Sequence, residues 1–167
     1  PVILEIGSGK GRFLVESAER NPHLNYIGIE KSLHYFRVIE SRLERRKLAN
    51  ARIINYDASV VVAKMIPDQS IHEVHIYFPD PWPRPRERKR RIIREETLEQ
   101  IHRILEPGGV GVYVTDHVEY FDKAVPQFEK YFKVRSGEIG PETPARTNYE
   151  GKYRAAGRAI YQIEFRI

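Results

Sequence analysis

The sequence lacks cysteine, and it contains only one methionine and one tryptophan. Without cysteine, disulfide scaffolds, thiolate metal sites and cysteine nucleophiles are excluded. The six histidines show no spacing typical of metal ligands, so we expect no metal site. The chain also has no long apolar run and no charged start followed by an apolar segment, which argues against a membrane span and a signal peptide. We therefore expect a cytoplasmic protein with no membrane partner.

Positive charge is what the chain has in excess. Its 28 lysines and arginines outnumber 23 aspartates and glutamates, which gives a formal net charge of +5. The excess is concentrated in residues 84–94, RPRERKRRIIR, where arginines and one lysine surround a single acid, Glu87. Such a cluster indicates a polyanionic partner, although a run of charge is often only a solvated helix start. Basic residues at a helix N-terminus oppose the helix dipole, and that small cost is consistent with a functional reason for the cluster.

Length and composition predict a single domain over residues 1–167. A chain of 167 residues that is 41% hydrophobic can bury one well-packed core, and it is too short for two domains of ordinary size. The chain begins at Pro1, without a methionine and directly on an apolar run. We expect that residues preceding Pro1 in the natural chain are missing here.

Apolar runs that predict strands alternate with amphipathic patterns that predict helices. Strands are expected over residues 1–7, 24–30, 51–58, 71–79 and 110–116, and helices over 9–22, 32–50, about 59–65, 92–109 and 117–132. Two half-exposed strands, 133–139 and 158–167, are expected to pair around a polar loop, 140–157. This order predicts an α/β fold with a doubly wound, mostly parallel sheet and a terminal antiparallel strand pair.

Three glycines, Gly7, Gly9 and Gly11, separate the first predicted strand from the first predicted helix. Glycine allows a tight turn and lets a ligand approach a helix N-terminus, so we place Gly7 and Gly9 in a cofactor-binding loop. The spacing is G-x-G-x-G, whereas dinucleotide-binding loops usually have G-x-G-x-x-G. Glu5, just before the loop, would repel a pyrophosphate but could bind a cationic amino group.

An acid stands at each of the first four predicted strands: Glu5, Glu30, Asp57 and Asp80. Ligands of doubly wound sheets bind outside the carboxyl ends of the strands, where these acids would meet. Any one of them alone is more often a helix N-cap or a solvated residue, but four make coincidence less probable. Glu30 stands where an acid binds ribose hydroxyls in both NAD and S-adenosylmethionine sites, and Asp57, followed by Ala58, could accept from the amine of adenine.

The segment FPDPWPRPRERKRR, residues 78–91, resembles the signature of bacterial tRNA (guanine-N7-)-methyltransferases. The resemblance extends to EIGSGKGRF (5–13), YIGIEKS (26–32), TDHVEYF (115–121) and RTNYEGKYR (146–154), and so covers nearly the whole chain in order. It implies a Rossmann-like class I methyltransferase with a seven-stranded sheet, S-adenosylmethionine as cofactor and tRNA as partner. The implied product is 7-methylguanosine, in the variable loop of tRNA.

The resemblance also assigns site residues by position. It implies that Glu5, Glu30, Asp57 and Asp80 bind the cofactor, and that Asp80 is also catalytic. Gly7 and Gly9 of the glycine loop, and Ala58 next to Asp57, are expected to bind the cofactor with them. The resemblance implies that Arg84, Asp116, Thr147, Asn148, Tyr149 and Glu150 bind the substrate. Arg84 departs from the family, which usually has lysine there, and a planar guanidinium makes different contacts from an ammonium. The position of the basic cluster predicts RNA contacts for Arg86, Arg88, Lys89, Arg90 and Arg91.

Several roles stay open at the level of sequence. Asp116 or Glu150 could read the edge of guanine, since a carboxylate accepts two parallel hydrogen bonds. Asp80 could lie between cofactor and base, or contact only the amino group of the cofactor. Trp82 could stack on a base or fill the space beneath its loop. An NAD-dependent oxidoreductase and a non-catalytic RNA-binding protein on the same fold are the alternatives, and either a monomer or a homodimer is compatible with the sequence.

Overall fold

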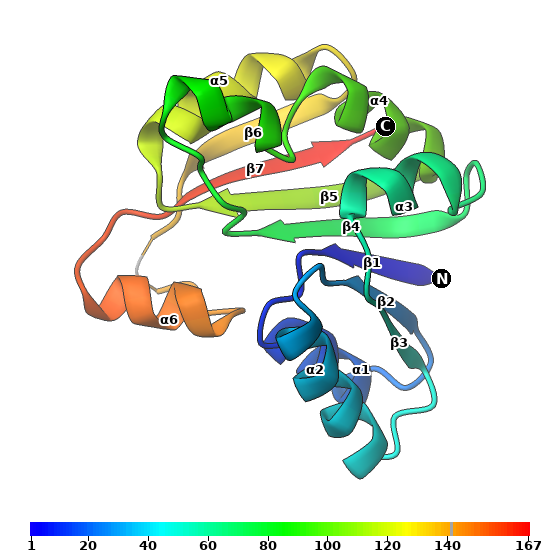
Figure 1. Ribbon diagram of the computed structural model, residues 1–167. Coiled ribbons are helices and arrows are strands. Elements are labelled where there is room, and N and C mark those ends of the chain that lie inside the picture. The colour runs from blue at the N-terminus through cyan, green and yellow to red at the C-terminus, as the bar shows by residue number, and fades with distance from the viewer. Residues whose placement is uncertain (141) are drawn as a thin grey trace.

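A seven-stranded sheet in the order β3-β2-β1-β4-β5-β7-β6 forms the centre of the computed structural model, which describes residues 1–140 and 142–167 (Figure 1). The first five strands of this order are parallel, and β7 is antiparallel to both β5 and β6. The predicted doubly wound α/β fold with a terminal antiparallel pair is therefore confirmed. In chain order, the elements are β1 (Val2–Ile6), α1 (Arg12–Arg20), β2 (Asn25–Ile29), α2 (Leu33–Arg45), β3 (Ala51–Ile54), α3 (Ala58–Lys64), β4 (Ile71–Tyr77), η1 (Pro85–Arg90), α4 (Glu95–Ile104), β5 (Leu105–Thr115), α5 (Val118–Glu129), β6 (Lys133–Glu138), α6 (Asn148–Ala155) and β7 (Tyr161–Arg166).

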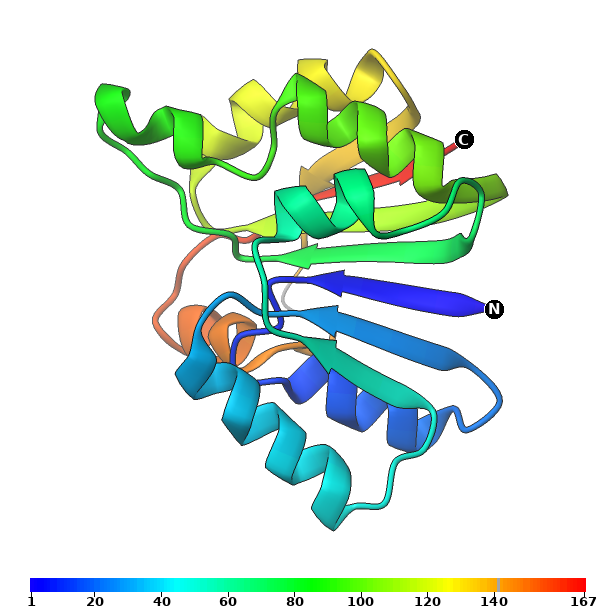
Figure 2. The ribbon, with the colours of Figure 1, turned by 45° about the vertical axis from the view of Figure 1, so that its right-hand side comes forward.

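The helices cover the two faces of the sheet unequally. Figures 1 and 2 show α1 and α2 on one face, beside β1, β2 and β3, and α3, α4 and α5 on the other. The larger core cluster lies under α3, α4 and α5 and includes the fully buried Leu98, Ile101 and Phe128. A smaller cluster under α1 and α2 includes Leu14 and Ile39. Apolar side chains on both faces explain why β1 reads as a continuous apolar run rather than an alternating one.

Two segments differ from the sequence-based prediction. Residues 140–157 were expected to be a polar loop, and residue 141 of this segment lies outside the described part of the chain. Within the segment α6 forms, and its only buried residue is the acid Glu150. Periodicity cannot reveal a helix whose buried member is charged. Residues 92–109 were expected to form one helix, but α4 spans only Glu95–Ile104, and Pro107, Gly108 and Gly109 belong to the long strand β5 rather than to a helix stop.

The basic cluster also has a different local structure from the expected helix start. Pro85–Arg90 forms a separate 3₁₀ helix, η1, and α4 begins five residues after its last residue, with Glu95 and Glu96 in its first turn. Negative side chains in a first turn interact favourably with the helix dipole. The predicted placement of the arginine run at the start of that helix, against the dipole, is therefore wrong.

Candidate functional site

A cavity of about 1200 Å³ opens at the carboxyl ends of the parallel strands. Its walls come from the loops after β1, β2, β3, β4 and β5 and from the first turn of α6. It lies where the strand order reverses between β1 and β4, which is where doubly wound sheets bind ligands. The predicted site residues that line it are Glu5, Gly7, Gly9, Glu30, Asp57, Ala58, Asp80, Lys89, Arg90, Asp116, Thr147, Asn148 and Tyr149.

The glycine loop requires glycine for backbone reasons. Gly7, Gly9 and Gly11 have φ angles of 78°, 51° and 73°, in the left-handed region. A Cβ atom on Gly11 would also lie 2.5 Å from the side chain of Ile39, so a side chain at this position would have to displace Ile39 of α2. The loop therefore turns sharply and leaves the floor of the cavity free of side chains at Gly7 and Gly9.

Glu30 connects the glycine loop to the start of α2. Its Oε2 accepts a hydrogen bond of 2.7 Å from the backbone N–H of Gly9, and its Oε1 accepts one of 2.7 Å from the backbone N–H of Ser32. A carboxylate has about four lone-pair sites, so two remain for a ligand. A rigidly held acceptor pair of this kind suits the two hydroxyls of a ribose.

Glu5 is buried beside the cavity with an unused oxygen. The residue is 2% exposed, and its Oε2 has no hydrogen-bond partner among the described residues. The hydroxyl of Ser8, in the adjacent loop, is also buried and lies close to this carboxyl, where it favours the ionised form. Burial, reinforced by the nearby Glu30 charge, raises the pKa of the Glu5 carboxyl to about 8. An unpartnered buried carboxyl at a cavity wall suits a ligand that brings a positive charge or N–H donors.

Asp57 is both a helix cap and part of the cavity wall. Its Oδ1 accepts from the backbone N–H of Ser59 at 3.0 Å, which caps α3, and its Oδ2 accepts from the Lys31 ammonium at 3.0 Å. Burial opposes the charge, but Lys31 and the Ser59 N–H outweigh it and hold the pKa of Asp57 below its ordinary value. The carboxylate therefore stays ionised and fixed, with lone pairs left for a donor next to Ala58.

Asp80 lies exposed at the tip of a strained segment. Phe78 and Trp82 have φ angles of 49° and 40°, which non-glycine residues rarely adopt, and Pro79 and Pro81 flank the acid. Asp80 makes no hydrogen bond or ion pair with any described residue. Backbone strain of this kind concentrates where side chains must be aimed at a ligand. Asp80 thus presents a free carboxylate to the cavity on a stiff support.

Trp82 is half-buried, and the guanidinium of Arg90 lies 4.9 Å from the centre of its ring. Both side chains line the cavity. A cation over an aromatic face is attracted to the ring quadrupole and holds the ring in place. The face of Trp82 next to Arg90 is therefore already occupied, and a base can stack there only if Arg90 moves.

Arg91 departs from the predicted RNA-binding role. It is 6% exposed, and its guanidinium donates to the backbone carbonyl of Pro81 at 2.7 Å and to the Glu119 carboxylate at 2.9 Å. It also lies 4.5 Å above the ring of Tyr120. Lys123 and Arg91 together lower the pKa of Glu119 to about 2. The placement of Arg91 does not support the predicted phosphate contact, since this side chain joins the Asp80 segment to α5.

The other basic residues of the cluster are more accessible. Arg84, Arg86, Lys89 and Arg90 are exposed, and Arg88 is half-buried and forms an ion pair of 3.3 Å with Glu119. Arg84, Arg86 and Arg88 do not line the cavity, whereas Lys89 and Arg90 do. The cluster therefore extends from the cavity wall onto the neighbouring surface.

Glu150 lies inside α6 rather than in the cavity. Its side chain is fully buried, its Oε2 accepts from the backbone N–H of Arg146 at 3.0 Å, and its Oε1 accepts from Arg154 at 2.7 Å. The hydroxyl of Thr147 accepts from the Glu150 N–H and caps the helix. Of the two acids considered as readers of guanine, only Asp116 lines the cavity, and the placement of Glu150 does not support a direct substrate contact.

Asp116 has a partner that sequence reasoning missed. Arg158 donates to its Oδ2 at 2.7 Å, and both side chains line the cavity. Arg158 also lies 4.8 Å above the ring of Tyr153. The two residues are 42 positions apart and meet because β7 returns antiparallel to β5, with Thr115 opposite Tyr161. Only the antiparallel return of the chain, and no local motif, could have indicated this pair.

The described residues include no group of three or more His, Asp or Glu side chains placed to hold a metal ion. Within the same residues, no helix is long and apolar enough to cross a membrane.

Known methyltransferases are similar to this chain over nearly its whole length. A family model described as "Putative methyltransferase" matches residues 1–163. A tRNA (guanine-N(7)-)-methyltransferase of Treponema pallidum (strain Nichols) is 38% identical over 99% of this chain and 66% of its own length, and one of Alkalilimnicola ehrlichii is 34% identical over 99% and 72%. A SAM-dependent methyltransferase from Aquifex aeolicus shares the fold, with a TM-score of 0.70 at 12% identity over 99% of this chain and 81% of that one. The chain thus spans 66% of the length of the Treponema protein.

Proposed function

Because the chain belongs to the tRNA (guanine-N(7)-)-methyltransferase family, we propose that it transfers a methyl group from S-adenosylmethionine to N7 of a guanosine in tRNA. The observation that carries the proposal is the convergence of Glu5, Glu30, Asp57 and Asp80 on one cavity at the strand ends. We further propose the variable-loop guanosine as the target, on the resemblance of the sequence to the family. Neither an NAD-dependent oxidoreductase nor a non-catalytic protein is supported by the comparisons.

The acids fit S-adenosylmethionine in chemical type. Glu30 keeps lone pairs for the ribose hydroxyls, and Asp57 beside Ala58 keeps lone pairs for the adenine amine. The buried, unpartnered oxygen of Glu5 suits the ammonium of the methionine portion. When bound, the cofactor supplies a methyl group on a positively charged sulfur. Asp80 then places a negative charge in the same cavity, where it orients the cofactor and the entering base.

Methylation of guanine N7 requires no general base. Guanine N7 carries a lone pair and no proton, so the residues need only align the base and exclude water. Asp116 offers two oxygens to the N1–H and N2–H₂ donors of guanine, and Arg158 fixes one of these oxygens at 2.7 Å. Asp116 is therefore proposed to read the base, and Arg158 to position Asp116.

The accessible part of the basic cluster is proposed to hold the RNA backbone. Arg84, Arg86, Lys89 and Arg90 are exposed next to the Asp80 segment, so phosphates bound there would flank a base inside the cavity. Arg88 can join them at the cost of its ion pair with Glu119, whereas Arg91 cannot without leaving the interior.

Methylation of unmodified tRNA tests the proposal. The protein is incubated with transcribed tRNA and S-adenosylmethionine, and the nucleosides are analysed, with 7-methylguanosine as the expected product. Asp116→Asn replaces one acceptor oxygen by a donor and is expected to lower kcat/KM by about ten- to a hundredfold, since a hydrogen bond to a charged group contributes about 1.5–3 kcal/mol. A different methylated nucleoside, or no product from protein that binds S-adenosylhomocysteine, contradicts the proposal.

Replacing the target guanosine by inosine, which lacks the N2 amine, sharpens the assignment of Asp116. The wild-type protein should methylate the inosine-containing tRNA less efficiently than the guanosine form. The Asp116→Asn variant should discriminate much less between them, because the group that reads the amine is altered. Equal discrimination by both proteins would show that a residue other than Asp116 recognises the N2 amine.

A further inference from the structure

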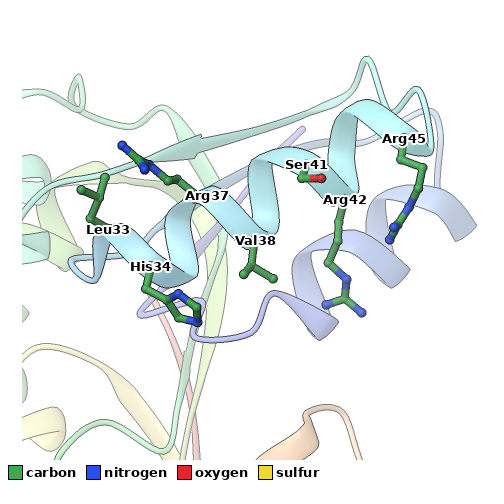
Figure 3. A pocket seen from close by; sticks show the side chains of 7 residues that line it. All are labelled: Leu33, His34, Arg37, Val38, Ser41, Arg42 and Arg45. Carbon is green, nitrogen blue, oxygen red and sulfur yellow. The ribbon is translucent and has the colours of Figure 1, made fainter.

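A second basic surface lies outside the cavity, along α2. Its lining consists of Leu33, His34, Arg37, Val38, Ser41, Arg42 and Arg45, which form an open groove of about 660 Å³. Figure 3 shows these side chains distributed from the first turn of α2 to its last. We call this surface the α2 groove, and none of the residues assigned above to cofactor or base belongs to it.

The α2 groove is cationic. Three of its seven residues are arginines, one is a histidine, and none of the described residues that line it is acidic. Arg37 and Arg45 are exposed and have no hydrogen bond or ion pair with any described residue. A favourable interaction with the helix dipole explains Arg45, at the C-terminal end of α2, but it does not explain Arg37 near the N-terminal end.

The groove also has exposed apolar surface. Leu33 is 52% exposed and Val38 is 37% exposed, so apolar side chains stand beside the arginines of the groove. An RNA backbone matches the positive charge of the groove, and the RNA proposed to enter the adjoining cavity would bring its phosphates to this surface.

The α2 groove adjoins the cavity. The residues around the start of α2 are divided between the two: Ser32 and Tyr35 line the cavity, whereas Leu33 and His34 line the groove. Arg42 also donates to the backbone carbonyl of Lys10 at 2.6 Å, which ties the groove to the glycine loop. A polyanion that enters the cavity past the basic cluster near η1 would meet the α2 groove on the other side of the glycine loop.

We propose that the α2 groove binds the phosphate backbone of the same tRNA, at nucleotides distant from the methylated guanosine. This inference rests on the proposed function. It implies that the RNA is held at two places, by the basic cluster after β4 and by Arg37 and Arg45 after β2, with the cavity between them. Binding at two separate surfaces should give a folded RNA a higher affinity than a short single strand.

The test is the salt dependence of tRNA binding. The double variant Arg37→Gln/Arg45→Gln removes two positive charges and keeps good helix formers. Each phosphate contact contributes about 0.7–0.9 to the slope of log affinity against log salt, so the slope should become shallower by about 1.5 in the variant. Affinity for tRNA at low salt should fall several-fold, whereas turnover at saturating tRNA and affinity for S-adenosylhomocysteine should stay as in the wild type.

A matched control is Arg135→Gln/Arg166→Gln. Both arginines are exposed on β6 and β7, at the opposite edge of the sheet, and their replacement changes the net charge equally. The control should bind tRNA with the slope of the wild type. An unchanged slope in the α2 variant, or an equal change in the control, overturns the inference. So does an α2 variant that loses self-association while its tRNA binding stays intact, because the groove would then be an interface between copies of the chain.

The two proposals can fail separately. Wild-type protein that methylates tRNA, together with an unchanged slope in the α2 variant, refutes the groove and leaves the function standing. Wild-type protein that binds tRNA but forms no 7-methylguanosine, together with a shallower slope in the variant, refutes the function and leaves the groove standing.

Discussion

Among single residues, Glu5 combines burial at the cavity wall with a raised pKa. Its folded-state pKa of about 8 lies above the ordinary value of 4.5 because the carboxyl is buried. Between these pH values the folded protein keeps a proton that the unfolded chain has released. Stability contributed by the neutral carboxyl is therefore complete below pH 4.5 and is lost as the pH rises to about 8.

Glu5→Gln should remove this pH dependence. We expect the variant and the wild type to differ least in melting temperature near pH 4.5, and the variant to gain relative to the wild type as the pH rises to about 8. The difference should reach a few kcal/mol, since one pKa unit corresponds to about 1.4 kcal/mol. Thermal unfolding of both proteins at several pH values measures it. A constant difference across this range would mean that the pKa of the Glu5 carboxyl is not raised.

At the scale of elements, the segment between β4 and α4 has an anchored part and a free part. Arg91 joins the carbonyl of Pro81 to Glu119 at the start of α5, so it fixes the stiff segment that carries Asp80. Arg86, five residues earlier, is exposed and has no hydrogen bond or ion pair with any described residue. The two arginines are identical in charge and differ only in their surroundings.

This difference predicts opposite outcomes for one substitution at two positions. Arg91→Gln should lower the free energy of unfolding by about 1.5–3 kcal/mol, because it removes the hydrogen bonds of a buried guanidinium to the Pro81 carbonyl and the Glu119 carboxylate, and should lower the melting temperature by about 3–12 °C. Arg86→Gln should change stability by less than about 0.5 kcal/mol but make the salt slope of tRNA binding shallower. Thermal unfolding and binding titrations measure both. Equal stability of the two variants would contradict the anchoring role of Arg91.

The same segment shows what sequence could and could not predict. The acids Glu5, Glu30 and Asp57 were predicted at the cavity because each is tied to a local apolar run that reads as a strand. The burial of Arg91 had no such signal, since it stands among exposed arginines and its partner lies 28 residues away. The partnership of Arg158 with Asp116 and the burial of Glu150 also had no local signal, because both depend on how β7 and α6 return to the sheet.

At the scale of the whole molecule, the position of the cavity links ligand binding to the stability of the entire fold. The glycine loop and Glu30 belong to the half of the sheet covered by α1 and α2, whereas Asp80 and Asp116 follow strands of the half covered by α4 and α5. A ligand that contacts both halves holds them together, and it has no comparable site on the unfolded chain. Its binding energy therefore appears in the stability of the entire fold.

S-adenosylhomocysteine should thus raise the melting temperature of the whole protein in a single transition. At a concentration of about 100 times Kd the gain is about 2.7 kcal/mol, or roughly 5–10 °C for a chain of this size. NAD should give no comparable shift, because the G-x-G-x-G loop departs from the G-x-G-x-x-G spacing of dinucleotide-binding loops. Glu30→Gln should reduce the shift with S-adenosylhomocysteine, since it weakens the acceptor pair that faces the ribose. Scanning calorimetry with each compound measures this, and a larger shift with NAD would contradict the cofactor assignment.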